Sequence, residues 1–240
     1  AVATNYPQGL QLFNATTGAA APHLPSFMGS ISYSPVIVGN IAYSRTDSQL
    51  QAINLDSGEA LWTISGLGYG TQKIVLNDQY LFYKQAGQIR VYDRATGVLA
   101  FRLDTPSSSH GELLLGSRNN ILDINYQSIT SFDLSTRKQN WSRSVSGNVS
   151  YDNYALANGQ FYFRDYSNVY SINEMTGTLS WRWDGNIYST SSILATLTHV
   201  FVTSSATTYA LSATTGEQVW SYEAGGKLAL GADGALYIQS

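Results

Sequence analysis

Apolar and polar residues alternate along this chain in short runs, which is the pattern of half-buried strands. Between residues 73 and 102, apolar runs at 73–76, 80–83, 89–92 and 99–102 are separated by Asn-Asp, Ala-Gly and Thr-Gly turns. Four antiparallel strands within about 40 residues form one blade of a β-propeller. No stretch has a useful helical period, so the pattern predicts an all-β protein built from four-stranded antiparallel blades.

This unit recurs along the whole chain. Each copy has two alternating apolar positions, a polar residue, a Thr-Gly-like turn and an aromatic residue four positions later. The turn falls at residues 18, 58, 97, 137, 177 and 216, so successive turns are 40, 39, 40, 40 and 39 residues apart. A repeat of this length is typical of propellers and solenoids. Residues 1–240 are therefore expected to form one domain, with an altered turn where Arg137 replaces glycine.

The two ends of the chain are out of phase with the blades. The chain starts with the third and fourth strands of a blade, at 10–13 and near 19–24, and ends with a first and second strand, at 227–230 and 235–238. Five complete units lie between these half-blades. The register predicts a six-bladed propeller that is closed by N-terminal strands pairing with C-terminal strands, an arrangement that leaves no open sheet edge.

Large aromatic residues follow the turn in five of the six repeats, and Pro22 takes this place in the first. A flat ring on the outer strand of a blade can cover the gap to the next blade. We therefore expect these rings to dock neighbouring blades together rather than to bind a ligand. The expected docking residues are Trp62, Phe101, Trp141, Trp181 and Trp220.

Composition narrows the possible partners. The net charge is −3, only 12% of residues are charged, and the 13 basic residues are scattered. Nucleic acids and anionic membranes need a concentrated positive field, and no apolar stretch approaches the length of a membrane span. Neither a nucleic-acid partner nor membrane insertion is expected. A chain that begins at Ala1 rather than Met is expected to be a processed or excised segment, and the low charge favours an extracytoplasmic protein that is secreted, periplasmic or at the cell surface.

Two segments carry a resemblance to a known family. The segments 53–62, which ends at Trp62, and 211–220, which ends at Trp220, look like the tryptophan-docking repeat of quinoprotein-like propellers. This PQQ-type family includes PQQ-dependent alcohol dehydrogenases and the BamB lipoprotein. The resemblance implies the propeller fold, because the repeat is structural in all of these proteins. The chain has no cysteine for the vicinal disulfide of the dehydrogenases, so a BamB-like scaffold fits better.

Residues with catalytic chemistry are dispersed. His23, His110 and His199 lie in different repeats without metal-ligand spacing,. The carboxylates recur before the turns, where Asp and Asn accept backbone hydrogen bonds. No Ser-His-Asp order or phosphate-binding glycine loop is evident. The sequence therefore predicts neither a metal nor a cofactor, and favours a non-catalytic protein without excluding an enzyme.

One face of the predicted propeller collects the candidate binding residues. The connections between blades and the turns between second and third strands share this face, where loops can vary without disturbing the ring. Tyrosine is frequent there and suits binding surfaces. The candidates are Phe27, Arg45, Tyr69, Lys84, His110, Tyr126, Tyr151, Asp152, Tyr166, Trp183 and Tyr188.

Three functions remain open at this point. The first is a protein-interaction module, either an extracytoplasmic scaffold for assembly or the sensor segment of a larger receptor. The second is a carbohydrate-binding propeller, because aromatic loops with Asn, Asp and Ser suit sugar recognition. The third, disfavoured by the missing cysteines and short loops, is a PQQ-dependent dehydrogenase.

Overall fold

The computed structural model describes most of the chain as β-structure. The described residues are 2–3, 10–11, 16–19, 35–46, 48–68, 70, 73–106, 111–145, 149, 153–165, 167–185, 187 and 192–239. None of them is helical, so no described helix could cross a membrane. The chain divides into two compact units, Ala1–Leu113 and Leu114–Ser240.

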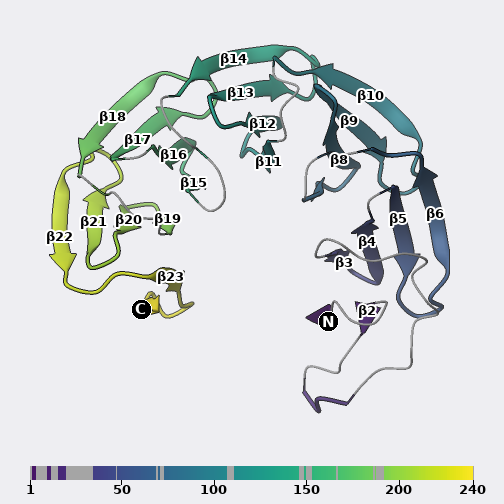
Figure 1. Cartoon of the computed structure of the whole chain (residues 1–240), viewed down its shortest axis with the longest axis horizontal. Coiled ribbons are helices and arrows are strands. Elements are labelled where there is room, and N and C mark those ends of the chain that lie inside the picture. Colours follow the sequence, from purple (N-terminus) through teal and green to yellow (C-terminus); the bar gives the residue numbers. More distant parts are fainter. Residues whose placement is uncertain are drawn as a thin grey trace. The chain divides into compact units, whose positions relative to one another are not determined.

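The first unit holds a short strand pair and two four-stranded sheets (Figure 1). The short pair is β1 (Val2–Ala3) and β2 (Leu10–Gln11). The first blade consists of β3 (Val36–Val38), β4 (Ile41–Arg45), β5 (Gln49–Asn54) and β6 (Ala60–Ser65). The second blade consists of β7 (Val75–Leu76), β8 (Tyr80–Gln85), β9 (Gln88–Asp93) and β10 (Leu99–Asp104). In both blades each strand pairs antiparallel with the next one in sequence.

Three more blades and a strand pair follow. The third blade, which begins at the boundary between the units, consists of β11 (Glu112–Leu115), β12 (Asn120–Ile124), β13 (Ser128–Asp133) and β14 (Gln139–Ser144). The fourth consists of β15 (Tyr154–Ala157), β16 (Gln160–Arg164), β17 (Asn168–Asn173) and β18 (Leu179–Asp184). The fifth consists of β19 (Ile193–Ala195), β20 (His199–Thr203), β21 (Thr208–Ser212) and β22 (Gln218–Tyr222). The last pair is β23 (Lys227–Leu230) and β24 (Leu236–Gln239).

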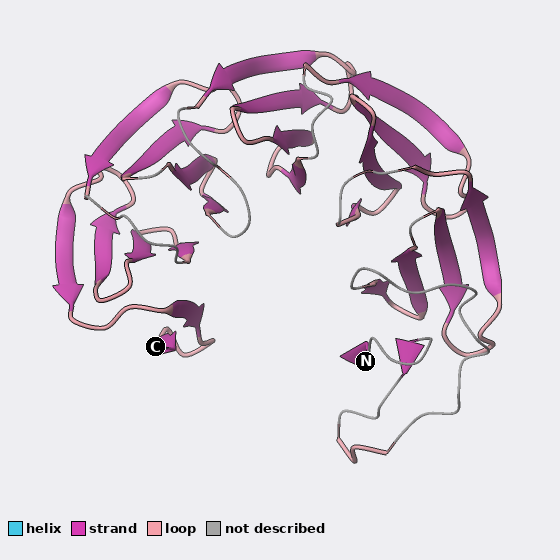
Figure 2. Ribbon diagram, viewed as in Figure 1, coloured by secondary structure: helices cyan, strands magenta, loops and turns pink. Residues whose placement is uncertain are grey.

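Burial follows the position of a strand within its blade. The second strands are almost continuously buried, and the residues of the third strands are all buried or half-buried, whereas the fourth strands β14 and β18 are mostly exposed. The fourth strand forms one edge of its sheet (Figure 2). A middle strand is covered on both faces and an outer strand on one, so only the outer strand needs a polar face. Apolar clusters fill the seams between the first and second, third and fourth, and fourth and fifth blades. The core therefore lies between blades.

The turn between the third and fourth strands has the same construction in successive blades. The side chains of Asp93 and Asn173 accept hydrogen bonds from the backbone N–H groups two and three residues later. Gly97 then closes the turn with φ 69°, a left-handed conformation that glycine adopts without a steric penalty,. Arg137 occupies that position with φ 59° and donates its N–H to the carbonyl oxygen of Asp133 at 2.9 Å. The expectation of an altered turn at Arg137 is therefore wrong.

The prediction of four-stranded antiparallel blades is confirmed in all five complete repeats. The expected C-terminal strands are β23 and β24. The expected strand near 19–24 lies outside the described residues, as do 12–13 of the strand expected at 10–13. Among the described strands, β1 pairs with β2 and β23 with β24.

Candidate functional site

Four of the eleven predicted binding residues lie in the described part of the chain. They are Arg45, Lys84, Tyr126 and Trp183. The other seven lie outside the described residues, namely Phe27, Tyr69, His110, Tyr151, Asp152, Tyr166 and Tyr188.

The two cations occupy the same position in consecutive blades and are buried there. Arg45 ends β4 and Lys84 lies near the end of β8, with exposed fractions of 3% and 2%. The Arg45 guanidinium lies over the ring of Tyr83, 5.2 Å from its centroid. Burial raises the pKa of Tyr83, an effect that the nearby Arg45 charge partly offsets. Both cations are thus buried instead of being presented to solvent.

The two aromatic residues differ in their surroundings. Tyr126 lies in the turn between β12 and β13 and is 46% exposed. Trp183 lies on β18, is half-buried, and packs against Tyr209 of β21 with ring centroids 5.1 Å apart. Tyr126 is thus the most accessible of the four described candidates, and Trp183 supports a blade seam.

Three of the expected docking tryptophans make one recurring contact. The indole Nε1–H of each donates to a backbone carbonyl of the next blade: Trp62 to Arg94 at 3.0 Å, Trp141 to Glu174 at 2.9 Å, and Trp181 to Ala213 at 2.9 Å. The six-membered part of the indole covers the turn glycine of that next blade so closely that a methyl group there would collide with it.

The remaining two docking residues differ from each other in burial. Phe101 on β10 is buried. Trp220 on β22 is 39% exposed and packs against Phe201 of its own blade with ring centroids 5.8 Å apart.

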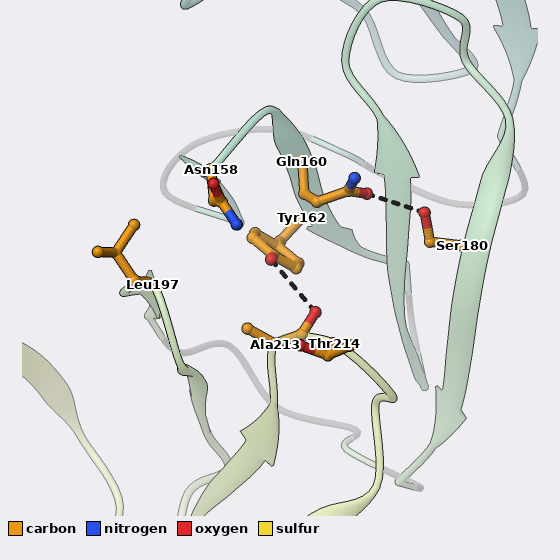
Figure 3. Close-up of a pocket in the computed structure, with 7 residues that line it drawn as sticks. All are labelled: Asn158, Gln160, Tyr162, Ser180, Leu197, Ala213 and Thr214. Atoms are coloured by element: carbon orange, nitrogen blue, oxygen red, sulfur yellow. Dashed lines mark hydrogen bonds between the residues drawn. The ribbon is translucent and has the colours of Figure 1, made fainter.

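A pocket of about 170 Å³ opens at the seam between the fourth and fifth blades (Figure 3). It lies beside the turn between β15 and β16, the turn between β19 and β20, and the turn between β21 and β22. These turns join first to second strands and third to fourth strands, whereas the face predicted from the sequence consists of blade connections and of turns between second and third strands. The lining residues are Asn158, Gln160, Tyr162, Ser180, Leu197, Ala213 and Thr214.

The pocket wall is uncharged but rich in hydrogen-bonding groups. The Gln160 Oε1 accepts from the hydroxyl of Ser180 at 2.8 Å and from that of Ser171 at 3.1 Å. The Tyr162 hydroxyl donates to the Ala213 carbonyl at 3.4 Å (Figure 3). Burial raises the pKa of Tyr162, so its hydroxyl stays protonated at neutral pH. Such a wall can bind a polar group, but it offers no acid or base that titrates near neutrality.

Metal-ligating side chains do not gather in the described ranges: no three of His, Asp and Glu lie close enough to hold an ion. His199, one of the three histidines considered from the sequence, stacks on Phe201 of the same strand with ring centroids 5.8 Å apart. Its Nδ1 shares a hydrogen bond with the Thr198 hydroxyl at 2.9 Å.

Sequence reasoning did not find the pocket. Its residues are ordinary neutral types on five different strands and turns, and only Ala213 and Thr214 belong to the repeat motif. One signal was available in the repeat itself. The signal is the residue that lies three positions before the turn glycine. It is Ala213 in the fifth blade, but Arg94 in the second blade and Glu174 in the fourth. A small residue at a position that elsewhere holds a long side chain indicates vacant space.

Comparison with known proteins gives one family match. A family model described as "Outer membrane protein assembly factor BamB" matches residues 125–238. Among curated proteins, no sequence matches the chain significantly.

Solved structures match over nearly the whole chain. BamB from Moraxella catarrhalis has a TM-score of 0.69 and 16% identity, covering 94% of this chain and 77% of that one. The computationally designed Ika8 protein has a TM-score of 0.77 and 15% identity, with coverages of 95% and 76%. A chain of the Mitotic Checkpoint Complex has a TM-score of 0.64 and 14% identity, with coverages of 94% and 77%. At such identities the likeness shows the fold. Taken with the repeat and the family match, it shows that the chain resembles the PQQ-repeat β-propellers of the BamB type, without pointing to a particular member.

Proposed function

We propose that this protein is a non-catalytic propeller that holds a protein partner, as an assembly scaffold outside the cytoplasm. The observation that carries the proposal is the match of residues 125–238 to a family described as an outer membrane protein assembly factor. The description of the matched family names protein assembly, and one of the matched structures is a protein complex. The same resemblance supports the proposal of a location in the periplasm, associated with the outer membrane.

The described chemistry is compatible with holding a partner rather than transforming a substrate. Arg45 and Lys84 are buried. The pocket beside Ala213 is lined by uncharged side chains. Exposed Tyr126 offers a rigid aromatic face with a polar tip, which suits a protein interface,.

The scaffold that we infer is a ring of six blades, in which the C-terminal strands pair with the N-terminal ones. Two observations support this closure. Trp220 is far more exposed than Trp181, which docks on a turn glycine. Gly18 lies in the equivalent turn of the first repeat, and no described atom lies within 4 Å of the place where its Cβ would be. At Gly97, Gly177 and Gly216 an indole ring occupies that place. If the ring closes in this way, deleting residues 1–19 and replacing Trp220 by Ala each remove the same contact. The loss of unfolding free energy in the combined variant should therefore be smaller than the sum of the two separate losses.

The scaffold proposal is tested by cross-linking the tagged protein in cells of its source and identifying the linked proteins by mass spectrometry. We expect one reproducible partner whose yield falls with Tyr126→Ala or with a substitution on the pocket face. A substitution of Val98, an exposed residue in the turn between β9 and β10, is the matched control. If no protein is linked above the level of an unrelated tagged control, the proposed function is wrong.

A further inference from the structure

One position in each complete blade is set by a shared backbone hydrogen bond. Its N–H donates to the carbonyl of the residue that precedes the second strand, at 2.8 to 3.0 Å. We call this the slot position, because in the second, fourth and fifth blades its residue contacts the preceding blade. In the five complete blades it holds Leu55, Arg94, Leu134, Glu174 and Ala213.

Arg94 shows what the slot of the second blade accommodates. Its guanidinium lies over the ring of Tyr43 in the first blade, 6.0 Å from the centroid. Its Nη1 donates to the carbonyl of Asn77 at 2.8 Å. The Arg94 carbonyl accepts the indole N–H of Trp62. The cation is thus held by an aromatic ring and a neutral oxygen.

The seam between the fourth and fifth blades repeats these surroundings. Tyr162 stands at the position of Tyr43 on the second strand, and the Ala213 carbonyl accepts the indole N–H of Trp181. Thr196 corresponds to Asn77, because each donates its backbone N–H to the carbonyl oxygen of the first residue of the second strand. The distance is 2.8 Å for Thr196 and 3.0 Å for Asn77. The main change is that the slot side chain is a methyl group.

The pocket lies where that longer side chain is missing, because Ala213 and Tyr162 both line it. An anion is less suited to this place than a cation. Glu174 fills the slot of the fourth blade with a carboxylate because the N–H and hydroxyl of Ser117 donate to it, at 2.5 and 2.6 Å. Ser117 lies in the four-residue turn between the first and second strands of the third blade. The same turn of the fourth blade, beside Ala213, has only the two residues Asn158 and Gly159 and therefore no residue equivalent to Ser117.

We propose that the pocket beside Ala213 binds the guanidinium group of an arginine side chain on a partner polypeptide, inserted where Arg94 lies in the second blade. This inference rests on the proposed function and specifies what the partner presents. A guanidinium is planar, weakly hydrated and carries five donors. Asn158 and Thr214 line the pocket, and an amide oxygen and a hydroxyl can both accept hydrogen bonds from a guanidinium.

The test uses N-acetyl-arginine amide as the probe, with the whole protein labelled with ¹⁵N. We expect saturable shifts of the Trp181 indole N–H and the Ala213 amide, with a dissociation constant of roughly 1 mM for so small a ligand. N-acetyl-citrulline amide, which has the same shape without the charge, should bind at least tenfold more weakly. Binding of free arginine shows whether the guanidinium comes from a polypeptide or from the free amino acid. A polypeptide side chain is favoured if N-acetyl-arginine amide binds more tightly than free arginine.

Filling the slot from within provides matched variants. Ala213→Arg should supply the protein's own guanidinium, and Ala213→Leu installs the residue that Leu55 and Leu134 show at this position. Each should weaken probe binding at least tenfold. Arg94→Ala should open a second site, seen as new shifts of the Trp62 indole N–H. The spectrum of each variant away from the seam reports whether it folds.

Several results would overturn the inference. They are the absence of shifts in the wild type, equal binding of citrulline, tighter binding of free arginine than of the amide, or undiminished binding by both Ala213 variants. The cross-linking experiment separates this inference from the proposed function. If the wild type and Ala213→Arg link the same partner equally well, the scaffold role stands and the arginine pocket fails. If no partner is linked, the scaffold role fails, and probe binding then reports on the pocket alone.

Discussion

Replacing Trp181 by Ala should be among the most damaging single changes in this protein. The side chain is 7% exposed and belongs to the apolar cluster between the fourth and fifth blades. Its indole N–H donates to the Ala213 carbonyl at 2.9 Å, and its ring lies against the turn of Gly216. The substitution removes all of these contacts at once and leaves a cavity in the seam.

The expected cost follows from these contacts. Truncating a buried tryptophan costs ~3–5 kcal/mol, and the lost hydrogen bond accounts for about 1 kcal/mol of that. The Ala213 carbonyl keeps the Tyr162 hydroxyl at 3.4 Å, so it is not left entirely unpaired. With a slope of about 2–3 kcal/mol per molar urea, the unfolding midpoint should fall by about 1 to 2.5 M.

The assay is urea denaturation followed by circular dichroism, because removing a tryptophan alters fluorescence. Tyr126→Ala is the control, since its ring is 46% exposed and its loss should cost about 0.5 kcal/mol or less,. An unchanged midpoint for Trp181→Ala would refute the assignment of this ring to the seam. The docking tryptophans would then have to be reconsidered as an exposed platform for a ligand.

Three further predictions concern other contacts of the blades. Gly216→Ala places a methyl group 2.5 Å from the Trp181 ring at φ 76°, so it should cost about 2–3 kcal/mol in denaturation; a neutral result would contradict the tight contact. Glu174→Ala leaves the Ser117 N–H and hydroxyl without their acceptor and should cost about 3 kcal/mol, measured in the same way and contradicted by an unchanged midpoint. The pKa of Asp93 lies below 3.8, chiefly because the hydroxyl and N–H of Thr96 donate to its carboxylate. The stability that this provides is present above the unfolded pKa and is lost as pH falls through the folded one. Asp93→Asn should therefore make stability between pH 5 and pH 2, followed by thermal unfolding, fall less steeply than in the wild type; equal slopes would argue against it.

Much of the blade could be predicted because it is local. Strand alternation, turn residues and a 39- or 40-residue period are written along the chain, and each blade pairs strands that are neighbours in sequence. The turn at Arg137 was predicted wrongly for a physical reason. Glycine is favoured in the left-handed conformation, but this conformation costs another residue only about 1–2 kcal/mol. The hydrogen bonds of Asp133 and the pairing of the flanking strands are sufficient to hold Arg137 in it.

The candidate site depended on contacts between blades, which no local pattern encodes. Arg45 and Lys84 read as surface cations in the sequence, but both are buried, and Arg45 lies over the Tyr83 ring of the next blade. The pocket likewise arises because Ala213 faces Tyr162 across a seam 51 residues away in sequence. The sequence by itself determined the repeat, the strands and the turns, since these follow from the residue at each position. Only the tertiary structure decided which side chains fill a seam and which seam is left open, because that depends on pairs of residues from different blades.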